Sequence, residues 1–255
     1  MSSVRFDTTP THVARLTLAR PERKNAFDGA LVAELTAFVE KIDPATRAVV
    51  LASEGDAFCA GADIGWLRGV ADFTLAENMA DSRALGAMFR ALYELDMPLV
   101  ARVQGAAIGG GAGLVAVADI AVASTDASFA FTETRLGIVP AVVSPYVVRK
   151  IGVARATALF VTGSRIDAKR AHEIGLVERL VEPADLDAAV ERVVAAILEG
   201  GPEAVRSAKR LAREVAGRPP DEVAEGLVER IARARVSDEG QEGMRAFLER
   251  RKPSW

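Results

Sequence analysis

Short apolar runs rich in β-branched residues recur through the first two thirds of the chain, and longer amphipathic stretches separate them. Four of these runs are predicted as strands, at residues 13–18, 48–52, 99–103 and 119–123. Between them, apolar residues recur three and four positions apart, as in the stretch 31–42, which is the spacing of one helix face. Strands that alternate with helices indicate crossover connections and mainly parallel strands, so the pattern predicts an α/β fold.

The strand signal ends near residue 183, and only helical periodicity follows. Gly- and Pro-rich breaks divide that part of the chain into four predicted helices, at residues 185–198, 202–215, 220–236 and 238–250. We therefore predict an α/β core at residues 1–183 and a helical region at residues 184–255. The apolar faces of these helices are unfavourable in water, so the region is expected to pack on the core or on another subunit.

The composition is that of a globular protein and narrows its partners. Half of the 255 residues are hydrophobic, which is enough for a sizeable core, and the formal net charge is −3. Nucleic acid is not expected as a partner, because binding it usually needs a basic face. The one cysteine, Cys59, excludes an intrachain disulfide, and together with two histidines it suggests no metal-ligand cluster, so no metal is expected.

The start of the chain and its apolar runs do not suggest a membrane protein. Residues 1–10 are polar and lack the apolar centre of a signal peptide. The longest apolar run, at residues 114–123, is interrupted by Asp119 and is too short to span a bilayer. Together with the single cysteine, these features predict a cytoplasmic protein with no membrane partner.

Two segments of small residues carry the strongest chemical signal. The first is Phe-Cys-Ala-Gly-Ala-Asp-Ile at residues 58–64, and the second is Ile-Gly-Gly-Gly at residues 108–111. Such segments can bring two backbone N–H groups to one point, where they stabilise a carbonyl oxygen that becomes negative during a reaction. Gly and Ala suit this role because no bulky side chain blocks the approach of a substrate to the main chain.

Taken in order, the motifs of this chain resemble the crotonase (enoyl-CoA hydratase/isomerase) superfamily. The resemblance covers almost the whole chain, at residues 20–26 (Arg-Pro-Glu-Arg-Lys-Asn-Ala), 57–64, 103–111, 129–140 and 240–253. It implies that residues 1–183 form a spiral core of repeated ββα units that holds the active site. It also implies that the helical region at residues 184–255 serves in packing and trimerisation, in a homotrimer or a dimer of trimers. It also implies an acyl-CoA thioester substrate, which itself carries coenzyme A, and no separate cofactor.

The resemblance also assigns residues to the substrate. The two N–H donors fall on Ala62 and Gly110, and the helix that begins at the second segment directs its N-terminus toward the thioester oxygen. The residues expected to contact the substrate are Arg23, Lys24, Ala60, Ala62, Asp63, Ile64 and Gly110. The two basic residues would lie near the nucleotide end of CoA, and ordinary exposed side chains are the alternative for these two.

Glu133 is the predicted catalytic carboxylate. By the resemblance it matches one of two glutamates that hydratases of this superfamily use for proton transfer. Its neighbours Phe129, Phe131 and Leu136 are apolar, so desolvation is expected to raise its pKa, which suits proton transfer near neutral pH. The alternative is a surface glutamate paired with Arg135.

Position 113 departs from the family pattern. The other family glutamate would lie three residues after Gly110, where this chain has Gly113, and a glycine cannot activate water. Hydration of a 2-enoyl-CoA remains the leading prediction, with Glu133 acting alone or with a substitute acid. The candidates for a substitute are Asp72, Glu77 and Asp81. The alternatives are an enoyl-CoA isomerase that uses Glu133 alone and a catalytically silent acyl-CoA binder.

A second departure follows Pro140, where the chain reads Ala-Val-Val-Ser-Pro-Tyr-Val-Val. With Gly113, this stretch resembles a bacterial subgroup of enoyl-CoA or methylglutaconyl-CoA hydratases, which favours hydration over isomerisation. Tyr146 within it is interpreted as a core aromatic residue, with contact to an acyl group as the alternative. Trp66, just after the first small-residue segment, is expected either to cover the CoA chain or acyl pocket or to pack in the core.

Overall fold

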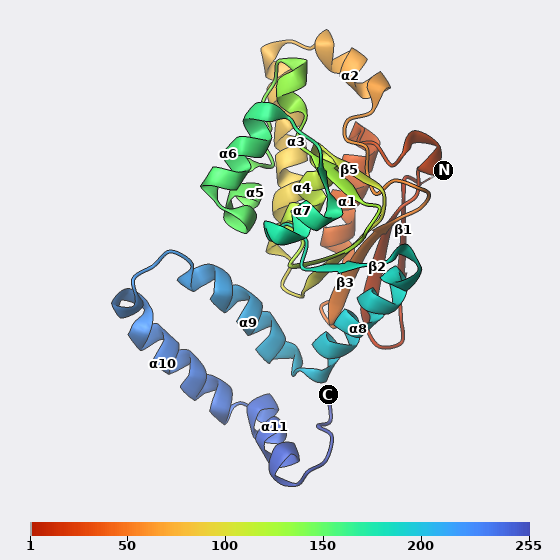
Figure 1. Ribbon diagram of the computed structural model, residues 1–255. Helices are drawn as coiled ribbons and strands as arrows, with labels where there is room; N and C mark the ends of the chain where they lie inside the picture. The colour runs from red at the N-terminus through yellow and green to blue at the C-terminus, as the bar shows by residue number, and fades with distance from the viewer. Residues whose placement is uncertain (1) are drawn as a thin grey trace.

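A six-stranded mixed sheet lies at the centre of the computed structural model, which describes residues 2–255 (Figure 1). In order across this main sheet, the strands are β1 (Val4–Thr8), β2 (Val13–Leu18), β3 (Ala48–Ser53), β4 (Leu99–Val103), β6 (Ile120–Ser124) and β9 (Arg179–Val181). β1 and β2 form an antiparallel hairpin, and every later pair is parallel. A second mixed sheet contains β5 (Ala106–Ile108), β7 (Ser128–Ala130) and β8 (Ile166–Asp167).

Helices connect and cover these strands. Those before residue 183 are α1 (Gly29–Lys41), α2 (Ile64–Ala71), α3 (Leu75–Glu94), α4 (Gly110–Val117), α5 (Ser144–Ile151), α6 (Val153–Thr162) and α7 (Ala168–Glu173). Those after it are α8 (Leu186–Glu199), α9 (Pro202–Val215), α10 (Pro220–Val236) and α11 (Asp238–Leu248). Short 3-10 helices are η1 (Pro21–Arg23), η2 (Glu133–Leu136) and η3 (Pro183–Asp185). No helix within residues 2–255 has both the length and the apolar character needed to cross a membrane.

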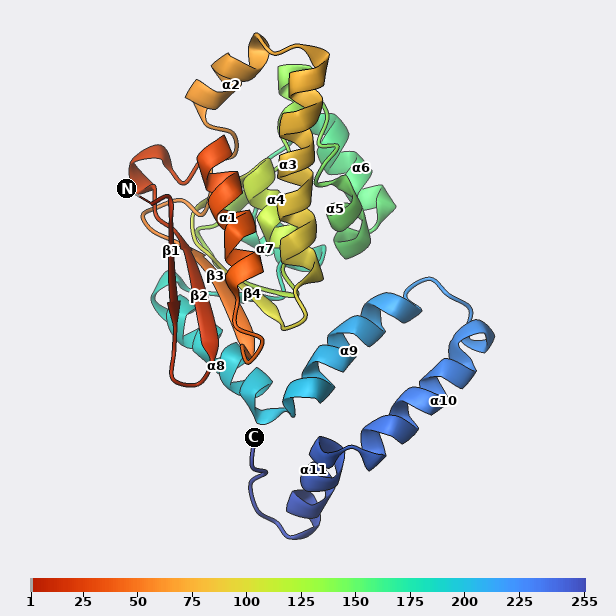
Figure 2. The same ribbon diagram turned by 180° about the vertical axis from the view of Figure 1, so that it is seen from behind.

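The main sheet is covered on both faces, because alternate residues of each strand point to opposite sides. Val49 and Leu51 of β3 join the larger core cluster with α1, α3 and α4, of which α1 and α3 run side by side in Figure 2. Ala48 and Val50 of the same strand join a second cluster with α8. α8 therefore packs on the core, although it lies beyond residue 183. The division of the chain at that residue stays a prediction.

Asp119, the charged residue inside an apolar run, anchors α9 to the core. Its Oδ2 accepts the N–H of Leu99 at 2.8 Å and pairs with Lys209 Nζ at 2.7 Å, while its Oδ1 pairs with Arg213 Nη2 at 2.7 Å. The Arg213 guanidinium also lies over the Tyr93 ring, 3.8 Å from its centroid. A partly buried carboxylate needs such partners, and α9 provides both cations.

α10 and α11 extend away from the core in both views (Figures 1 and 2). The residue buried on these two helices is Ala246. Their exposed large apolar side chains are Val228, Ile231, Val236, Met244, Phe247 and Leu248. So many exposed apolar side chains on two neighbouring helices are unfavourable in water.

Candidate active site

Ala62 lies on an extended segment that pairs with Phe27 and leaves the Ala62 N–H group without a partner. Phe27 donates its N–H to the carbonyl oxygen of Gly61 at 2.7 Å, and the Phe27 carbonyl oxygen accepts the N–H of Asp63 at 2.7 Å. In this parallel bridge the backbone groups of the opposite residue, Ala62, point away from Phe27. Within the described chain no acceptor takes the Ala62 N–H, so it is available to an external oxygen.

Gly110 supplies a second available N–H at the start of α4. The chain leaves β5 through Gly109, whose φ of 54° lies in the left-handed region and whose N–H donates to the Ala130 carbonyl oxygen at 2.8 Å. Gly110 is the first residue of α4, so its N–H has no acceptor within the helix. It also lies at the positive end of the helix dipole, which favours a negative oxygen there.

Close packing joins the two small-residue segments. A Cβ on Gly111 would lie 2.3 Å from the carbonyl oxygen of Cys59, and a Cβ on Gly61 would lie 3.1 Å from the carbonyl oxygen of Ile108. Ile108 also donates its N–H to the Cys59 carbonyl oxygen at 2.9 Å. A larger residue at position 111 would push α4 away from the first segment. Glycine therefore allows the two N–H donors to lie on directly adjacent segments. Residues 58–64 are called the first donor segment, and residues 108–111 the second.

The Glu133 carboxyl group lies beside the second segment. η2 begins at this residue, and its Oε1 is 3.4 Å from the place that a Cβ on Gly109 would occupy. Its Oε2 is buried and has no hydrogen-bond partner within residues 2–255. Burial raises the pKa of Glu133 above its ordinary value of 4.5, because the ionised form loses hydration. Arg135 does not contribute to this shift, as it would in the surface pair considered as the alternative.

Asn25 fixes the loop that carries Phe27. Its Oδ1 accepts the N–H of Arg20 at 2.9 Å, and its Nδ2 donates to the carbonyl oxygens of Glu54 at 2.8 Å and Ala57 at 2.9 Å. Its φ of 54° is a left-handed conformation, which asparagine adopts more readily than most residues. The buried asparagine thus ties this loop to the residues just before the first donor segment.

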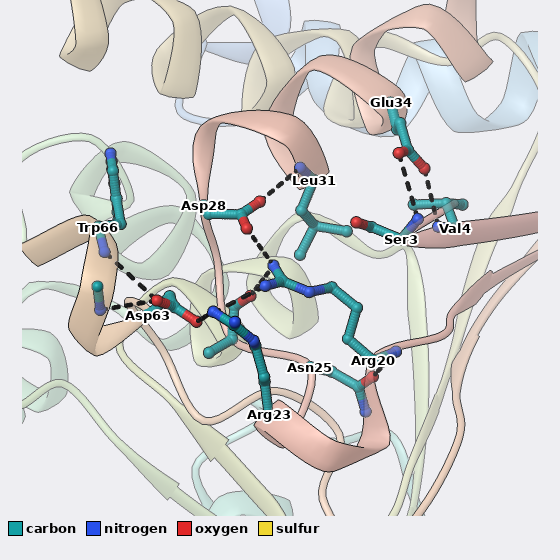
Figure 3. Close-up of polar contacts among 12 residues, drawn as sticks. Ser3, Val4, Arg20, Arg23, Asn25, Asp28, Leu31, Glu34, Asp63 and Trp66 are labelled. Atoms are coloured by element: carbon teal, nitrogen blue, oxygen red, sulfur yellow. Dashed lines mark hydrogen bonds and ion pairs between the residues drawn. The ribbon is translucent and has the colours of Figure 1, made fainter. Parts of the chain in front are cut away.

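Asp63 begins α2 and is held by two arginines (Figure 3). Its Oδ1 accepts the N–H of Gly65 at 2.8 Å and that of Trp66 at 3.3 Å, which caps the first turn of α2. Its Oδ2 accepts a hydrogen bond from Arg23 Nη1 at 3.0 Å and lies 3.6 Å from Arg20 Nη2. The hydrogen bond from Arg23 lowers the pKa of Asp63, so this carboxylate stays ionised and serves the local structure.

The chain matches one known family over nearly its full length. The family model for enoyl-CoA hydratase/isomerase matches residues 8–255. The chain belongs to the enoyl-CoA hydratase/isomerase family. The match shows the family and does not distinguish the subgroup of methylglutaconyl-CoA hydratases within it.

Members of this family share the fold as well as the sequence. A Thermus thermophilus protein named "Putative enoyl-CoA hydratase" is 34% identical, with 95% of this chain and 96% of that protein covered. A Legionella pneumophila structure named "putative enoyl CoA hydratase/isomerase (crotonase)" is 41% identical with a TM-score of 0.95, covering 99% of this chain and 98% of that chain. A Shewanella pealeana "enoyl-CoA hydratase" structure is 36% identical with a TM-score of 0.94, covering 99% and 96%. The predicted α/β crotonase fold with C-terminal helices is confirmed.

Within this crotonase fold, the residues predicted to hold CoA surround the first donor segment. Ala60 donates its N–H to the carbonyl oxygen of Lys24 at 2.9 Å, which joins the two basic residues to that segment. Lys24 and Ile64 are exposed, and the Arg23 side chain remains 55% exposed although it is bonded to Asp63. The structure brings these residues together, and their contacts with CoA stay a prediction.

Two of the three acids considered as substitutes for the missing family glutamate have structural partners. Glu77 completes a capping box with Thr74, from which its Oε2 accepts both the N–H and the hydroxyl at 2.7 Å. Asp81 Oδ1 accepts the indole N–H of Trp66 at 3.2 Å. This hydrogen bond from the Trp66 side chain links α2 to α3. The third acid, Asp72, is exposed at the end of α2.

Two other residues noted in the sequence have packing roles. Cys59 is fully buried, and burial raises the pKa of its thiol to about 12, so the thiol stays protonated near neutral pH. The Tyr146 ring packs against the rings of Phe89 and Tyr93, with centroids 6.3 and 5.1 Å away. These contacts favour the core interpretation of Tyr146.

Sequence reasoning missed the part that Phe27 plays. Besides pairing with the first donor segment, its ring lies against the second, since a Cβ on Gly110 would be 2.8 Å from Phe27 Cε2. The pattern of residues around position 27 shows no sign of this pairing. The only available signal was the glycine at position 110, which indicates that another group packs closely against it.

Proposed function

We propose that this family member catalyses the reversible hydration of a 2-enoyl-CoA thioester. The observation that supports it best is the arrangement of two unpartnered N–H donors, on Ala62 and Gly110, beside the partly buried carboxyl group of Glu133. The relatives named as hydratases support the same reaction class.

In the proposed reaction, the thioester oxygen accepts hydrogen bonds from the N–H groups of Ala62 and Gly110. As a water oxygen forms a bond to C3, the electrons of the C2=C3 double bond move toward the carbonyl and give an enolate. The two donors and the N-terminus of α4 stabilise its negative oxygen. Glu133 takes a proton from the water and, as the neutral acid, gives a proton to C2, and its raised pKa suits both steps.

We further propose that the CoA portion of the substrate lies along the first donor segment. Its contacts would be with the main chain of Ala60, Asp63 and Ile64, and with the side chains of Arg23 and Lys24. The residue pattern at 141–148 resembles a subgroup of enoyl-CoA or methylglutaconyl-CoA hydratases, so a methylglutaconyl group is one candidate acyl group. Other 2-enoyl groups use the same chemistry.

Isomerisation of an enoyl-CoA is the second candidate, and Gly113 is the observation that favours it. Moving a proton between C2 and C4 needs one carboxylate, and this chain has one at the donors. A catalytically silent acyl-CoA binder is the third candidate. It would keep the donors and lack turnover.

Incubation with crotonyl-CoA in heavy-oxygen water tests these candidates. The expected result is rapid loss of the conjugated thioester absorbance, with the heavy oxygen attached at C3 of the product. Conversion of a 3-enoyl-CoA without oxygen uptake, in a protein that leaves crotonyl-CoA unchanged, would instead support isomerisation. A protein that binds CoA esters and converts neither substrate would support the silent binder.

We propose that the protein is a homotrimer or a dimer of trimers in the cytoplasm, and that α10 and α11 take part in assembly. The exposed apolar side chains on these helices support this. Light scattering at micromolar concentration is expected to give the mass of three or six chains. Replacing Phe247 and Leu248 together with serine is expected to weaken assembly, because both are among the most exposed apolar residues. A monomeric wild-type protein would contradict the proposal.

A further inference from the structure

Gly113 lies on α4, three residues after the Gly110 donor. Its N–H donates to the carbonyl oxygen of Gly109 at 3.0 Å, and Gly109 lies beside the Glu133 carboxyl group. Position 113 is therefore about 4.5 Å along the helix from the Gly110 donor. The φ of Gly113 is not in the left-handed region. Its neighbours, rather than its backbone conformation, account for the glycine.

Two buried side chains fill the space that a side chain at position 113 would need. A Cβ there would lie 2.4 Å from Val143 Cγ1 and 3.1 Å from Cε1 and Cζ of Phe89. Val143 is 4% exposed and Phe89 is fully buried. The space beside Gly113 is thus occupied, and a side chain at this position would have to displace Val143 or Phe89.

Both of these side chains are held by their surroundings. The carbonyl oxygen of Val143 accepts the N–H of Tyr146 at 3.1 Å and that of Val147 at 3.2 Å, which fixes Val143 at the start of α5. The Phe89 ring packs between the rings of Phe27 and Tyr146, with centroid distances of 6.1 and 6.3 Å. Displacing either residue would disturb the aromatic contacts that also support the donor segments.

We propose that Val143 occupies the place that a second carboxylate, at position 113, would need, which leaves proton transfer to Glu133. This inference rests on the proposed function and specifies its proton route. Without a carboxylate at position 113, the O–C3 bond forms as a water O–H bond breaks, and Glu133 takes that proton. The C2–H bond then forms as Glu133 returns a proton and becomes a carboxylate again, so one carboxylate completes the reaction.

Thermal unfolding of G113A, V143A and the double variant tests the packing. G113A is expected to lower Tm by at least about 3 °C, because its Cβ overlaps Val143. V143A is expected to remove most of that loss in the double variant, which a double-mutant cycle measures as coupling. A G113A protein with the Tm of the wild type, or purely additive effects, would overturn the proposal.

Enzyme kinetics tests the chemical part, with a matched pair of variants. G113E/V143A provides a carboxylate and room for it, whereas G113Q/V143A has a side chain of the same size that transfers no proton. The expected hydration kcat is at least ~10-fold higher for the glutamate variant, and the two proteins are expected to have similar Tm values. Equal rates in two folded variants would contradict the exclusion of a second acid by Val143.

The two proposals fail in different ways. A wild-type protein that does not hydrate crotonyl-CoA contradicts the proposed function, whatever the unfolding measurements give. The coupling between positions 113 and 143 is measured without substrate. If this coupling is absent in a protein that does hydrate crotonyl-CoA, only the role of Val143 is overturned. If the glutamate and glutamine variants do not fold, the coupling measurement by itself decides the role of Val143.

Discussion

Replacing Glu133 with glutamine is expected to lower kcat for hydration at least ~100-fold, the range for loss of a general acid–base group. Glutamine keeps the shape of the side chain but takes no proton from water. The measurement is the initial rate at saturating substrate.

The pH profile of the wild-type protein gives a second test of Glu133. As the pH is lowered, kcat/KM is expected to begin to fall while the pH is still above 4.5, because burial raises the pKa of Glu133 above that value and the protonated group cannot act as the base.

The stability of the same variant provides a control. A raised folded-state pKa means that the protonated Glu133 side chain favours the folded state. That contribution is present below pH 4.5 and is lost as the pH rises through the folded-state pKa. The amide in E133Q does not titrate. The Tm of the variant relative to the wild type is therefore expected to rise as the pH increases from 4.5 through the folded-state pKa of Glu133. A folded E133Q protein with full hydratase activity would show that another group transfers the proton.

The sequence predicted the elements that carry their own pattern of buried residues. Residues 13–18 and 99–103 coincide with β2 and β4, and residues 202–215 and 220–236 coincide with α9 and α10. β1 was missed because four of its residues are exposed, and the strands β5, β7, β8 and β9 were missed because they have two or three residues each. A strand of two or three residues is too short to show alternation, and only its pairing with distant partners defines it.

The same distinction applies to the site. The two donor segments were predicted because runs of Gly and Ala mark places where a backbone is closely approached. The glycine at position 113 was noted only as a missing carboxylate. That Val143 fills its place, and that Phe27 pairs with the first segment, depends on contacts between residues far apart in the chain. Such contacts are set by tertiary packing, which no local pattern of residues records.

Gly110→Pro is expected to lower kcat about 100- to 1000-fold relative to Gly110→Ala, the range for loss of one oxyanion-hole donor. Both substitutions add a Cβ, which meets the Phe27 ring at 2.8 Å, so the two proteins share that overlap. Proline also removes the N–H and places its ring Cδ on the nitrogen. Because Gly110 is the first residue of α4, that N–H bonds no carbonyl within the helix, and proline is well tolerated at such a position. Steady-state kinetics of the two variants therefore isolates the donor.

The division of the effect between kcat and KM shows what the Gly110 donor does. A hydrogen bond that strengthens as the enolate forms lowers kcat when it is lost and leaves KM nearly unchanged. Loss confined to KM would mean that Gly110 holds the substrate and its reacting state equally. If the proline and alanine variants, both folded by their Tm values, have equal activity, the N-terminus of α4 is not part of the oxyanion hole. Hydration and isomerisation both pass through an enolate. Either reaction would then need a hydrogen-bond donor other than Gly110 to act together with the Ala62 N–H.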